Sequence, residues 1–125
     1  MSIQHKAKAV AIVDDDESVL SALEDLIESE GLSVLCFGSA EQFLNAGAQH
    51  EAACLIADIR MPGMSGLELQ ARLNAERCPI PTIFITAHGD AEMRTLAIRE
   101  GAVEFLTKPF DDTVLLALVH AAIDD

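Results

Sequence analysis

The chain has 125 residues, half of them hydrophobic, and carries 8 lysines and arginines against 21 aspartates and glutamates, for a net charge of −13 with histidine counted as neutral. This length suits one compact domain, and so large a hydrophobic fraction excludes a disordered chain. The strong negative charge argues against direct binding to nucleic acid or to an anionic membrane, because phosphate groups are bound by basic patches.

The first half of the chain predicts short strands alternating with helices. Apolar residues 9–13 form a continuous run that ends in acidic residues, the pattern of a strand buried on both faces. Residues 17–30 then place leucine, isoleucine and valine on one side of a helix. Residues 32–37 predict a second strand, and Ser39, with a glutamine three residues later, predicts the start of a second helix. Residues 54–57 predict the third strand.

The second half continues this alternation. A helix is predicted after Gly66, a fourth strand over 82–86, a helix over 91–100 and a short fifth strand over 103–106. Residues 111–123 predict the last helix. Its residues expected to face the core are Val114, Leu115, Leu118, Val119 and Ala122.

Strict alternation with short connections predicts a parallel sheet covered by helices on both faces. Five strands in a chain of this length suit the flavodoxin-like, doubly wound (βα)5 arrangement, with strand order 2-1-3-4-5. We therefore predict an α/β fold with a single domain over residues 1–125.

Nothing in the sequence predicts a secreted or membrane protein. No apolar run approaches the ~20 residues of a membrane span, and residues 1–7 contain no apolar signal core. The cysteines, Cys36, Cys54 and Cys78, form no closely spaced pair. We therefore expect a cytoplasmic protein with reduced, buried thiols and no membrane partner.

Polar residues stand where the predicted strands end. Asp14 and Asp15 follow the first strand, Asp58 follows the third, Thr86 ends the fourth and Lys108 follows the fifth. Ligands of open parallel sheets bind at the carboxyl ends of the strands, near the point where the strand order reverses. The predicted order therefore brings these side chains to one small patch.

Several carboxylates in one patch repel one another unless a proton or a cation neutralises them. Ligation by oxygen alone favours Mg²⁺, with Mn²⁺ as the alternative. Asp16, at the start of the first helix, also suits a simple helix cap. Asp58 arrives from a different strand and is the candidate nucleophile, which would take a phosphoryl group as an acyl phosphate. Lys108 and Thr86 are then candidates to neutralise and hydrogen-bond the phosphoryl oxygens.

Four separated motifs resemble the receiver domain of two-component response regulators. They are Asp14-Asp15 after the apolar strand, Asp58 within residues 57–66, Thr86-Ala87, and Lys108-Pro109-Phe110, and the similarity covers essentially residues 8–124. Residues 86–90 and 108–112 are most similar to the FixJ/NarL-type branch, and to FixJ-like receivers in particular. Such regulators usually carry a C-terminal helix-turn-helix DNA-binding domain. Since this chain contains no output domain, we expect an excised or stand-alone receiver.

The resemblance implies a CheY-like fold and a set of functional residues. Asp58 accepts a phosphoryl group from a sensor histidine kinase or a phosphotransfer protein. Asp14, Asp15, Asp58 and the backbone carbonyl of Arg60 hold Mg²⁺. Lys108 pairs with the phosphoryl group, Thr86 moves to hydrogen-bond it, and the peptide bond before the following proline is cis. The role is regulatory rather than enzymatic.

The resemblance also implies a switch. Phe105 occupies the position of the family's aromatic switch, and movement of Thr86 repacks the surface formed by the fourth helix, fifth strand and fifth helix. That surface controls an output, expected to be transcription, or a symmetric dimer through the fourth helix and fifth strand. Arg60 and His88 lie where the family tunes the lifetime of the phosphoryl group.

Two other functions fit part of the sequence. Residues 14–18 also match the DxDx(S/T) pattern of haloacid-dehalogenase-like phosphatases, with Asp14 as nucleophile and Asp16 as general acid. That assignment leaves Asp58 without a role and predicts repeated turnover of small phosphomonoesters. A degenerate receiver, acting as a binding module without phosphorylation, is the other alternative, and the intact acidic residues, threonine and lysine speak against it.

Overall fold

The computed structural model describes residues 9–87 and 90–124. Within these residues the strands form one sheet, in the order β2-β1-β3-β4-β5, and every neighbouring pair is parallel. The strands are β1 (Ala9–Val13), β2 (Ser33–Phe37), β3 (Ala52–Ala57), β4 (Thr82–Thr86) and β5 (Glu104–Thr107). The predicted flavodoxin-like arrangement is therefore confirmed.

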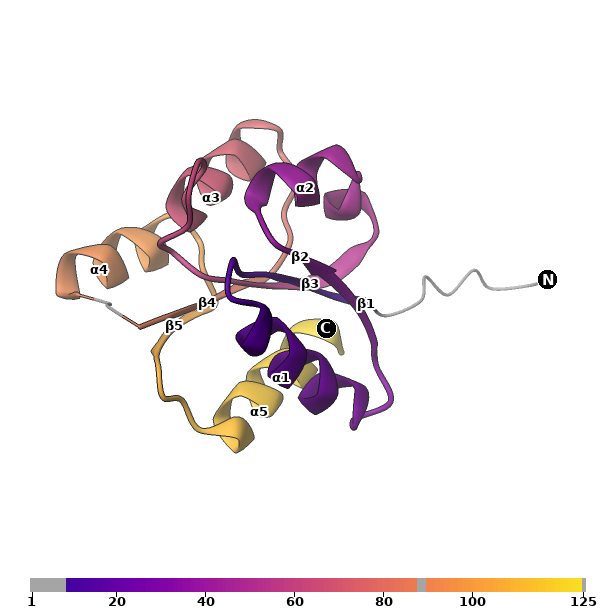
Figure 1. Ribbon diagram of the computed structural model, residues 1–125. Coiled ribbons are helices and arrows are strands. Elements are labelled where there is room, and N and C mark those ends of the chain that lie inside the picture. Colours follow the sequence, from indigo (N-terminus) through magenta and orange to yellow (C-terminus); the bar gives the residue numbers. More distant parts are fainter. Residues whose placement is uncertain (1–8, 88–89, 125) are drawn as a thin grey trace.

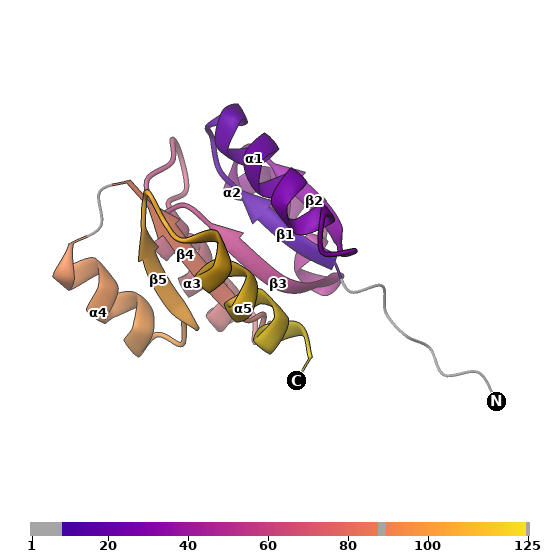
Figure 2. The same ribbon diagram turned by 90° about the horizontal axis from the view of Figure 1, so that it is seen from below.

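Helices cover both faces of this sheet (Figures 1 and 2). On one face lie α1 (Glu17–Glu28) and α5 (Asp112–Ile123). On the other lie α2 (Ala40–Asn45), α3 (Gly66–Ala75) and α4 (Ala91–Arg99), and a 3-10 turn at Ala48–His50 leads into β3. No helix in the described part of the chain has both the length and the apolar composition needed to cross a bilayer.

Each face of the sheet has its own hydrophobic core, because successive strand residues point to opposite sides. Val10 and Ile12 of β1 belong to the cluster that α1 and α5 cover. Ala11 and Val13 of the same strand belong to the cluster that α2, α3 and α4 cover. Since β1 is buried along its whole length, its apolar run has no polar alternation.

The structure corrects several local predictions. In α5 the buried residues are Leu115, Val119 and Ile123, one every four residues. The Val114 side chain is rotated away from that stripe and is 46% exposed, so its predicted inward orientation is wrong. Of the cysteines, Cys54 is buried but Cys36 is exposed on the edge strand β2. Burial of all three thiols was therefore also a wrong prediction.

The register of the strands brings the predicted site residues together. Val13 pairs with Ala57, and the backbone N–H of Asp58 donates to the Val13 carbonyl. Nearer the β5 edge of the sheet, the backbone N–H of Lys108 donates to the Thr86 carbonyl. The carboxyl ends of β1, β3, β4 and β5 therefore share one rim.

Candidate functional site

Three carboxylates meet at the rim of the sheet. Asp14 directly follows β1 and is buried, Asp15 beside it is exposed, and Asp58 directly follows β3 and is buried. One carboxylate oxygen from each lies within 4.8 Å of the others. This is an oxygen-only donor set, half open to solvent, and its size and chemistry suit a hard divalent cation.

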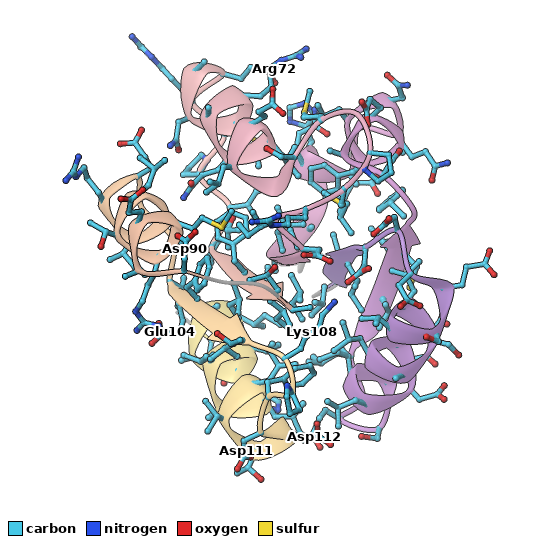
Figure 3. The ribbon with its side chains drawn as sticks, turned by 60° about the vertical axis from the view of Figure 1, so that its left-hand side comes forward. Arg72, Asp90, Glu104, Lys108, Asp111 and Asp112 are labelled. Carbon is cyan, nitrogen blue, oxygen red and sulfur yellow. The ribbon has the colours of Figure 1, made fainter. Side chains whose placement is uncertain are left out.

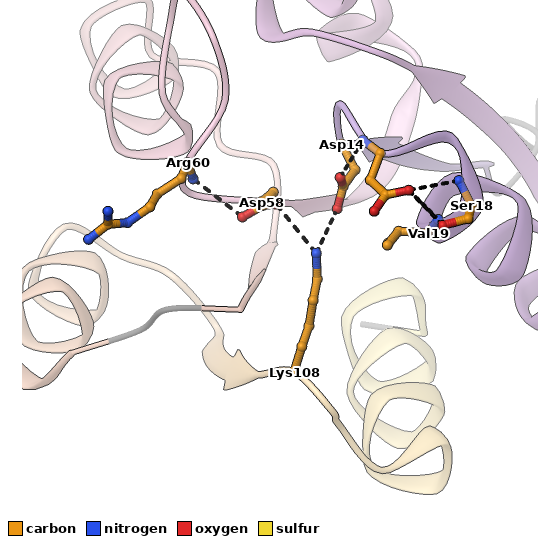
Figure 4. A network of polar contacts seen from close by, with 7 residues as sticks. Asp14, Ser18, Val19, Asp58, Arg60 and Lys108 are labelled. Atoms are coloured by element: carbon orange, nitrogen blue, oxygen red, sulfur yellow. Dashed lines mark hydrogen bonds and ion pairs between the residues drawn. The ribbon is translucent and has the colours of Figure 1, made fainter.

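Lys108 reaches this cluster from the other side of the rim (Figure 4). Its Nζ lies 3.1 Å from Asp14 Oδ2 and 3.4 Å from Asp58 Oδ2. The ammonium group therefore bridges two carboxylates that belong to different strands. One positive charge against three carboxylates leaves the cluster with excess negative charge.

The pKa values reflect this crowding. Burial raises the pKa of the Asp14 carboxyl, and the charge on Asp58 raises it further, against the lowering effect of the Asp16 N–H and of Lys108. Burial acts to lower the pKa of Lys108, but Asp14 and Asp58 together raise it above its ordinary value. The lysine is therefore held in its charged form, whereas burial disfavours the charged form of Asp14.

The loop after β3 holds the Asp58 side chain at the rim. The backbone N–H of Arg60 donates to Asp58 Oδ1 at 3.3 Å. Gly66 lies so close to Asp58 that a Cβ atom at this position would overlap the Asp58 carbonyl oxygen. The backbone N–H of Met64 donates to Glu41 Oε2 at 3.0 Å, which ties the loop to α2. These contacts restrict where the Asp58 carboxylate can point.

Thr86 closes the rim on the side of β4. It is the last residue of that strand and is buried. Because its carbonyl accepts the Lys108 N–H at 2.8 Å, the backbone of Thr86 is joined directly to the residue whose side chain contacts the carboxylates. The rim thus combines the Asp58 carboxylate with two further carboxylates that could bind a metal ion. It also contains the ammonium group of Lys108 and the hydroxyl group of the buried Thr86.

Comparison with known proteins assigns this arrangement to a family. Residues 10–120 match the family described as "Response regulator receiver domain". The chain belongs to this family. The resemblance that the four motifs suggested is therefore confirmed.

Relatives of this receiver domain include named response regulators. "Response regulator protein TodT" of Pseudomonas putida strain F1 is 49% identical over 118 residues, which cover 94% of this chain and 52% of TodT. "Transcriptional regulatory protein FixJ" of Azorhizobium caulinodans is 44% identical over 114 residues, covering 91% of this chain and 54% of FixJ. The chain thus spans about half the length of these curated relatives.

Solved structures agree with this assignment. The structure titled "CRYSTAL STRUCTURE OF FIXJ-N" superimposes with a TM-score of 0.84 at 39% identity, covering 98% of this chain and 96% of that one. The fold of the receiver domain is therefore supported both by its own topology and by a relative of known structure.

The structure brings together most of the predicted site residues. Asp14, Asp15, Asp58 and Lys108 form one contact group, and the Lys108–Pro109 bond is cis as expected. The side chain of Arg60 extends away from Asp58 (Figure 4), so it does not cover the carboxylate in this conformation. His88 lies outside the described residues.

Phe105 and Asp16 have simpler surroundings. The Phe105 ring is buried in the core cluster beneath α2, α3 and α4. Asp16 caps α1: its side chain accepts from the backbone N–H groups of Ser18 and Val19 and from the Ser18 hydroxyl. A carboxylate engaged in this way favours the cap over the general acid of the phosphatase alternative.

Two residues that hold the site were missed in the sequence. Gly66 is the first residue of α3, a position where most residue types are tolerated, and its close approach to Asp58 depends on the path of the loop. Glu41 is far from the site in the chain and reads as an ordinary acidic residue in the first turn of α2. The sequence offered one signal for Gly66, because a glycine directly after the helix-capping Ser65 indicates a close approach of the backbone.

Proposed function

We propose that this receiver domain accepts a phosphoryl group on Asp58 from a histidine kinase or a phosphotransfer protein. The observation that carries this proposal is the position of the Asp58 carboxylate at the rim, 3.4 Å from the Lys108 ammonium and beside Asp14 and Asp15. A carboxylate needs a concentrated positive field to act as a nucleophile towards a dianionic phosphoryl group.

In the proposed reaction one Asp58 carboxylate oxygen attacks the phosphorus atom of a phosphohistidine. The bond between phosphorus and the imidazole nitrogen breaks, its electron pair returns to the imidazole, and an acyl phosphate forms on Asp58. Lys108 Nζ, already near Asp58 Oδ2, pairs with a phosphoryl oxygen. Thr86 donates its hydroxyl to another phosphoryl oxygen.

The three carboxylates also suit a divalent cation, Mg²⁺ or Mn²⁺. Asp14, Asp15 and Asp58 would hold it through carboxylate oxygens, and Arg60 would add its backbone carbonyl. When bound, the cation neutralises charge on the phosphoryl oxygens. This proposal agrees with the raised pKa of Asp14, whose main cause is burial of the carboxylate, because a bound cation would favour the charged form.

The proposed role is regulatory. Each molecule takes up one phosphoryl group and later loses it to water, and it does not turn over an external substrate. Arg60 and His88 are proposed to tune the lifetime of the phosphoryl group, since both follow residues that contact it. In the described conformation the Arg60 side chain points away from Asp58, so this role requires rotation of that side chain.

The proposed output surface is formed by α4, β5 and α5. Movement of Thr86 towards the phosphoryl group would alter the packing near Phe105, which is buried under this surface. The face also exposes large apolar residues, Leu96, Ile98 and Val103, next to Arg94 and Arg99. A dimer through α4 and β5, and control of transcription as in the relative named FixJ, are the proposed consequences.

The proposal is tested by phosphorylation with acetyl phosphate or a phosphorylated kinase in the presence of Mg²⁺, followed by intact-mass measurement. We expect a single phosphoryl group on the parent protein and none on Asp58→Asn. The Asp16→Asn variant keeps an oxygen for the α1 cap and is expected to label like the parent. Loss of labelling in Asp16→Asn with labelling retained in Asp58→Asn would support the phosphatase instead. A parent that takes up no phosphoryl group would support the degenerate module.

A further inference from the structure

The open edge of the sheet has an unusual closure at Phe105. β5 is the last strand in the order, so one of its sides has no neighbouring strand. On that side the backbone N–H of Phe105 donates to Glu104 Oε1 at 2.9 Å, and the Phe105 carbonyl accepts from Arg94 Nη1 at 2.8 Å. Two side chains therefore occupy the backbone groups that another strand would use.

The two side chains are also bonded to each other. Arg94 Nη2 lies 2.9 Å from the same Glu104 oxygen that accepts the Phe105 N–H. A planar guanidinium group can serve the carbonyl and the carboxylate together because its N–H groups are held in a fixed fork. The result is a closed ring of hydrogen bonds, which we call the edge lock: Arg94, Glu104 and the backbone of Phe105.

The edge lock joins two elements of the proposed output surface. Arg94 lies in α4, whereas Glu104 and Phe105 lie in β5. Figure 3 shows Glu104 beside α4, and Lys108 farther along the same chain segment, at the rim. Because a hydrogen bond is lost when its atoms separate much beyond 3.5 Å, even a small shift of α4 along β5 breaks the lock.

We propose that the edge lock is an autoinhibitory contact, which holds α4 against β5 and keeps this edge closed to a second copy of the chain until Asp58 is phosphorylated. This inference rests on the proposed function and concerns how the output surface is regulated. In the unphosphorylated protein Arg94 and Glu104 satisfy each other. In the dimer the same groups bind across the interface.

Charge complementarity favours a second copy as the occupant. A symmetric dimer apposes the same surface patch of both chains. A patch that holds Arg94 on α4 and Glu104 on β5 is self-complementary, because each arginine can meet the glutamate of the other copy. The exposed Ile98 and Val103 line the same surface hollow as this pair and supply apolar area that the single chain leaves uncovered.

Linkage predicts a second property of the lock. If phosphorylation favours the open form, then opening the lock by mutation must favour binding of a phosphoryl group, because coupling between two sites is reciprocal. The protein with a closed edge lock and the protein with an open edge lock then differ in affinity for a phosphoryl mimic. This property is measurable at protein concentrations too low for dimerisation.

The first measurement is amide hydrogen exchange of Phe105 in the unphosphorylated protein. In Glu104→Ala we expect this amide to exchange about tenfold faster than in the parent, since its acceptor is removed. Arg72→Ala is the matched control: the exposed fractions of Arg72 and Glu76 are 53% and 37%, against 54% and 31% for Arg94 and Glu104. That control pair lies at the C-terminal end of α3, and its loss is expected to leave the Phe105 amide unchanged.

The second measurement is the affinity for beryllium trifluoride with Mg²⁺. Arg94→Ala and Glu104→Ala are expected to bind this mimic about three- to tenfold more tightly than the parent and Arg72→Ala. Unchanged exchange at Phe105, or unchanged affinity for the mimic, would overturn the lock. If the parent itself binds no mimic, the proposed function fails, whereas the exchange of Phe105 still reports on the closure of the edge.

The third measurement tests the exchange of partners. Arg94→Glu and Glu104→Arg each place two like charges on one face, so each variant alone should self-associate more weakly than the parent with beryllium trifluoride bound. In a one-to-one mixture each chain meets the opposite charges of the other, and a heterodimer should form at lower concentration than either homodimer. Sedimentation of the mixture as a simple sum of its components would contradict the assignment of a second copy.

Discussion

The receiver domain contains two ion-pair groups that differ in burial and in balance. At the rim, Lys108 is 20% exposed and contacts side chains of Asp14 and Asp58 that are 4% and 10% exposed. At the edge of the sheet, Arg94 and Glu104 are 54% and 31% exposed. The rim joins residues that are distant in the chain, whereas the pair at the edge joins two consecutive elements. Only the rim places excess charge of one sign out of water.

This difference separates two tasks. A buried group with excess negative charge costs stability and in return binds positive charge strongly. An exposed pair contributes little stability, because water replaces the lost contacts, and it is therefore suited to break and re-form. The rim is therefore suited to binding a ligand, and the edge lock is suited to opening and closing reversibly.

The largest effect should come from adding the missing positive charge to the rim. Mg²⁺ at a hundredfold excess over its dissociation constant is expected to raise the free energy of unfolding by about 2.7 kcal/mol. Chemical denaturation with and without Mg²⁺ measures this difference. Asp15→Asn removes one exposed ligand and should reduce the effect of Mg²⁺. A sodium salt of the same anion should leave the free energy of unfolding unchanged.

Removing the lysine from the rim should have the next largest effect. Lys108→Met keeps an unbranched apolar chain but leaves Asp14 and Asp58 without their shared cation. Without divalent cations we expect a loss of about 2 kcal/mol in the free energy of unfolding, less than for a fully buried pair because Lys108 is partly exposed. Urea denaturation measures it. A loss of free energy of unfolding no larger than that of Arg94→Ala would contradict the proposed difference between the rim and the edge lock.

Neutralising one acidic residue should act in the opposite direction. The raised pKa of Asp14 shows that the folded protein disfavours its charged form. Asp14→Asn is therefore expected to raise the free energy of unfolding at neutral pH in the absence of divalent cations, because it removes a charge that burial disfavours. The same variant should lose most of the stabilisation by Mg²⁺. Thermal denaturation in both conditions measures the two effects. A metal-free variant less stable than the parent would show that burial of the Asp14 charge is not costly.

The smallest effect should come from the edge lock. Arg94→Ala removes an exposed arginine and its hydrogen bond to the Phe105 carbonyl. We expect a change of about 0.5 kcal/mol or less in the free energy of unfolding. Urea denaturation next to Arg72→Ala provides the comparison. A loss as large as that of Lys108→Met would mean that the lock is a structural brace rather than a reversible contact.

Much of the fold and of the rim could be predicted from local patterns. The apolar run 9–13 and the alternation of strands and helices were enough to predict a parallel sheet in the observed order. Asp14, Asp58 and Lys108 then had to approach one another, because the carboxyl ends of neighbouring parallel strands lie at one edge. Strand boundaries shifted by one or two residues, as at β5, where Val103 joins Thr82 by a backbone hydrogen bond but precedes the strand.

Other features depend on the angle and depth at which elements pack. The exposure of Val114 follows from the rotation of α5 about its axis, which its nearly continuous apolar sequence does not specify. The need for glycine at Gly66 follows from how closely α3 begins beside Asp58. The contact between Arg94 and the Phe105 carbonyl spans eleven residues and two elements, so no local spacing predicts it.

The sequence by itself determined which chemistry gathers at the rim, because strand direction and strand order place the end of each strand without knowledge of side-chain packing. Only the tertiary structure decided how that chemistry is oriented and how β5 is closed. The partners of long side chains such as those of Arg94 and Glu104 depend on how the helices dock on the sheet, because small differences in docking choose among several available contacts.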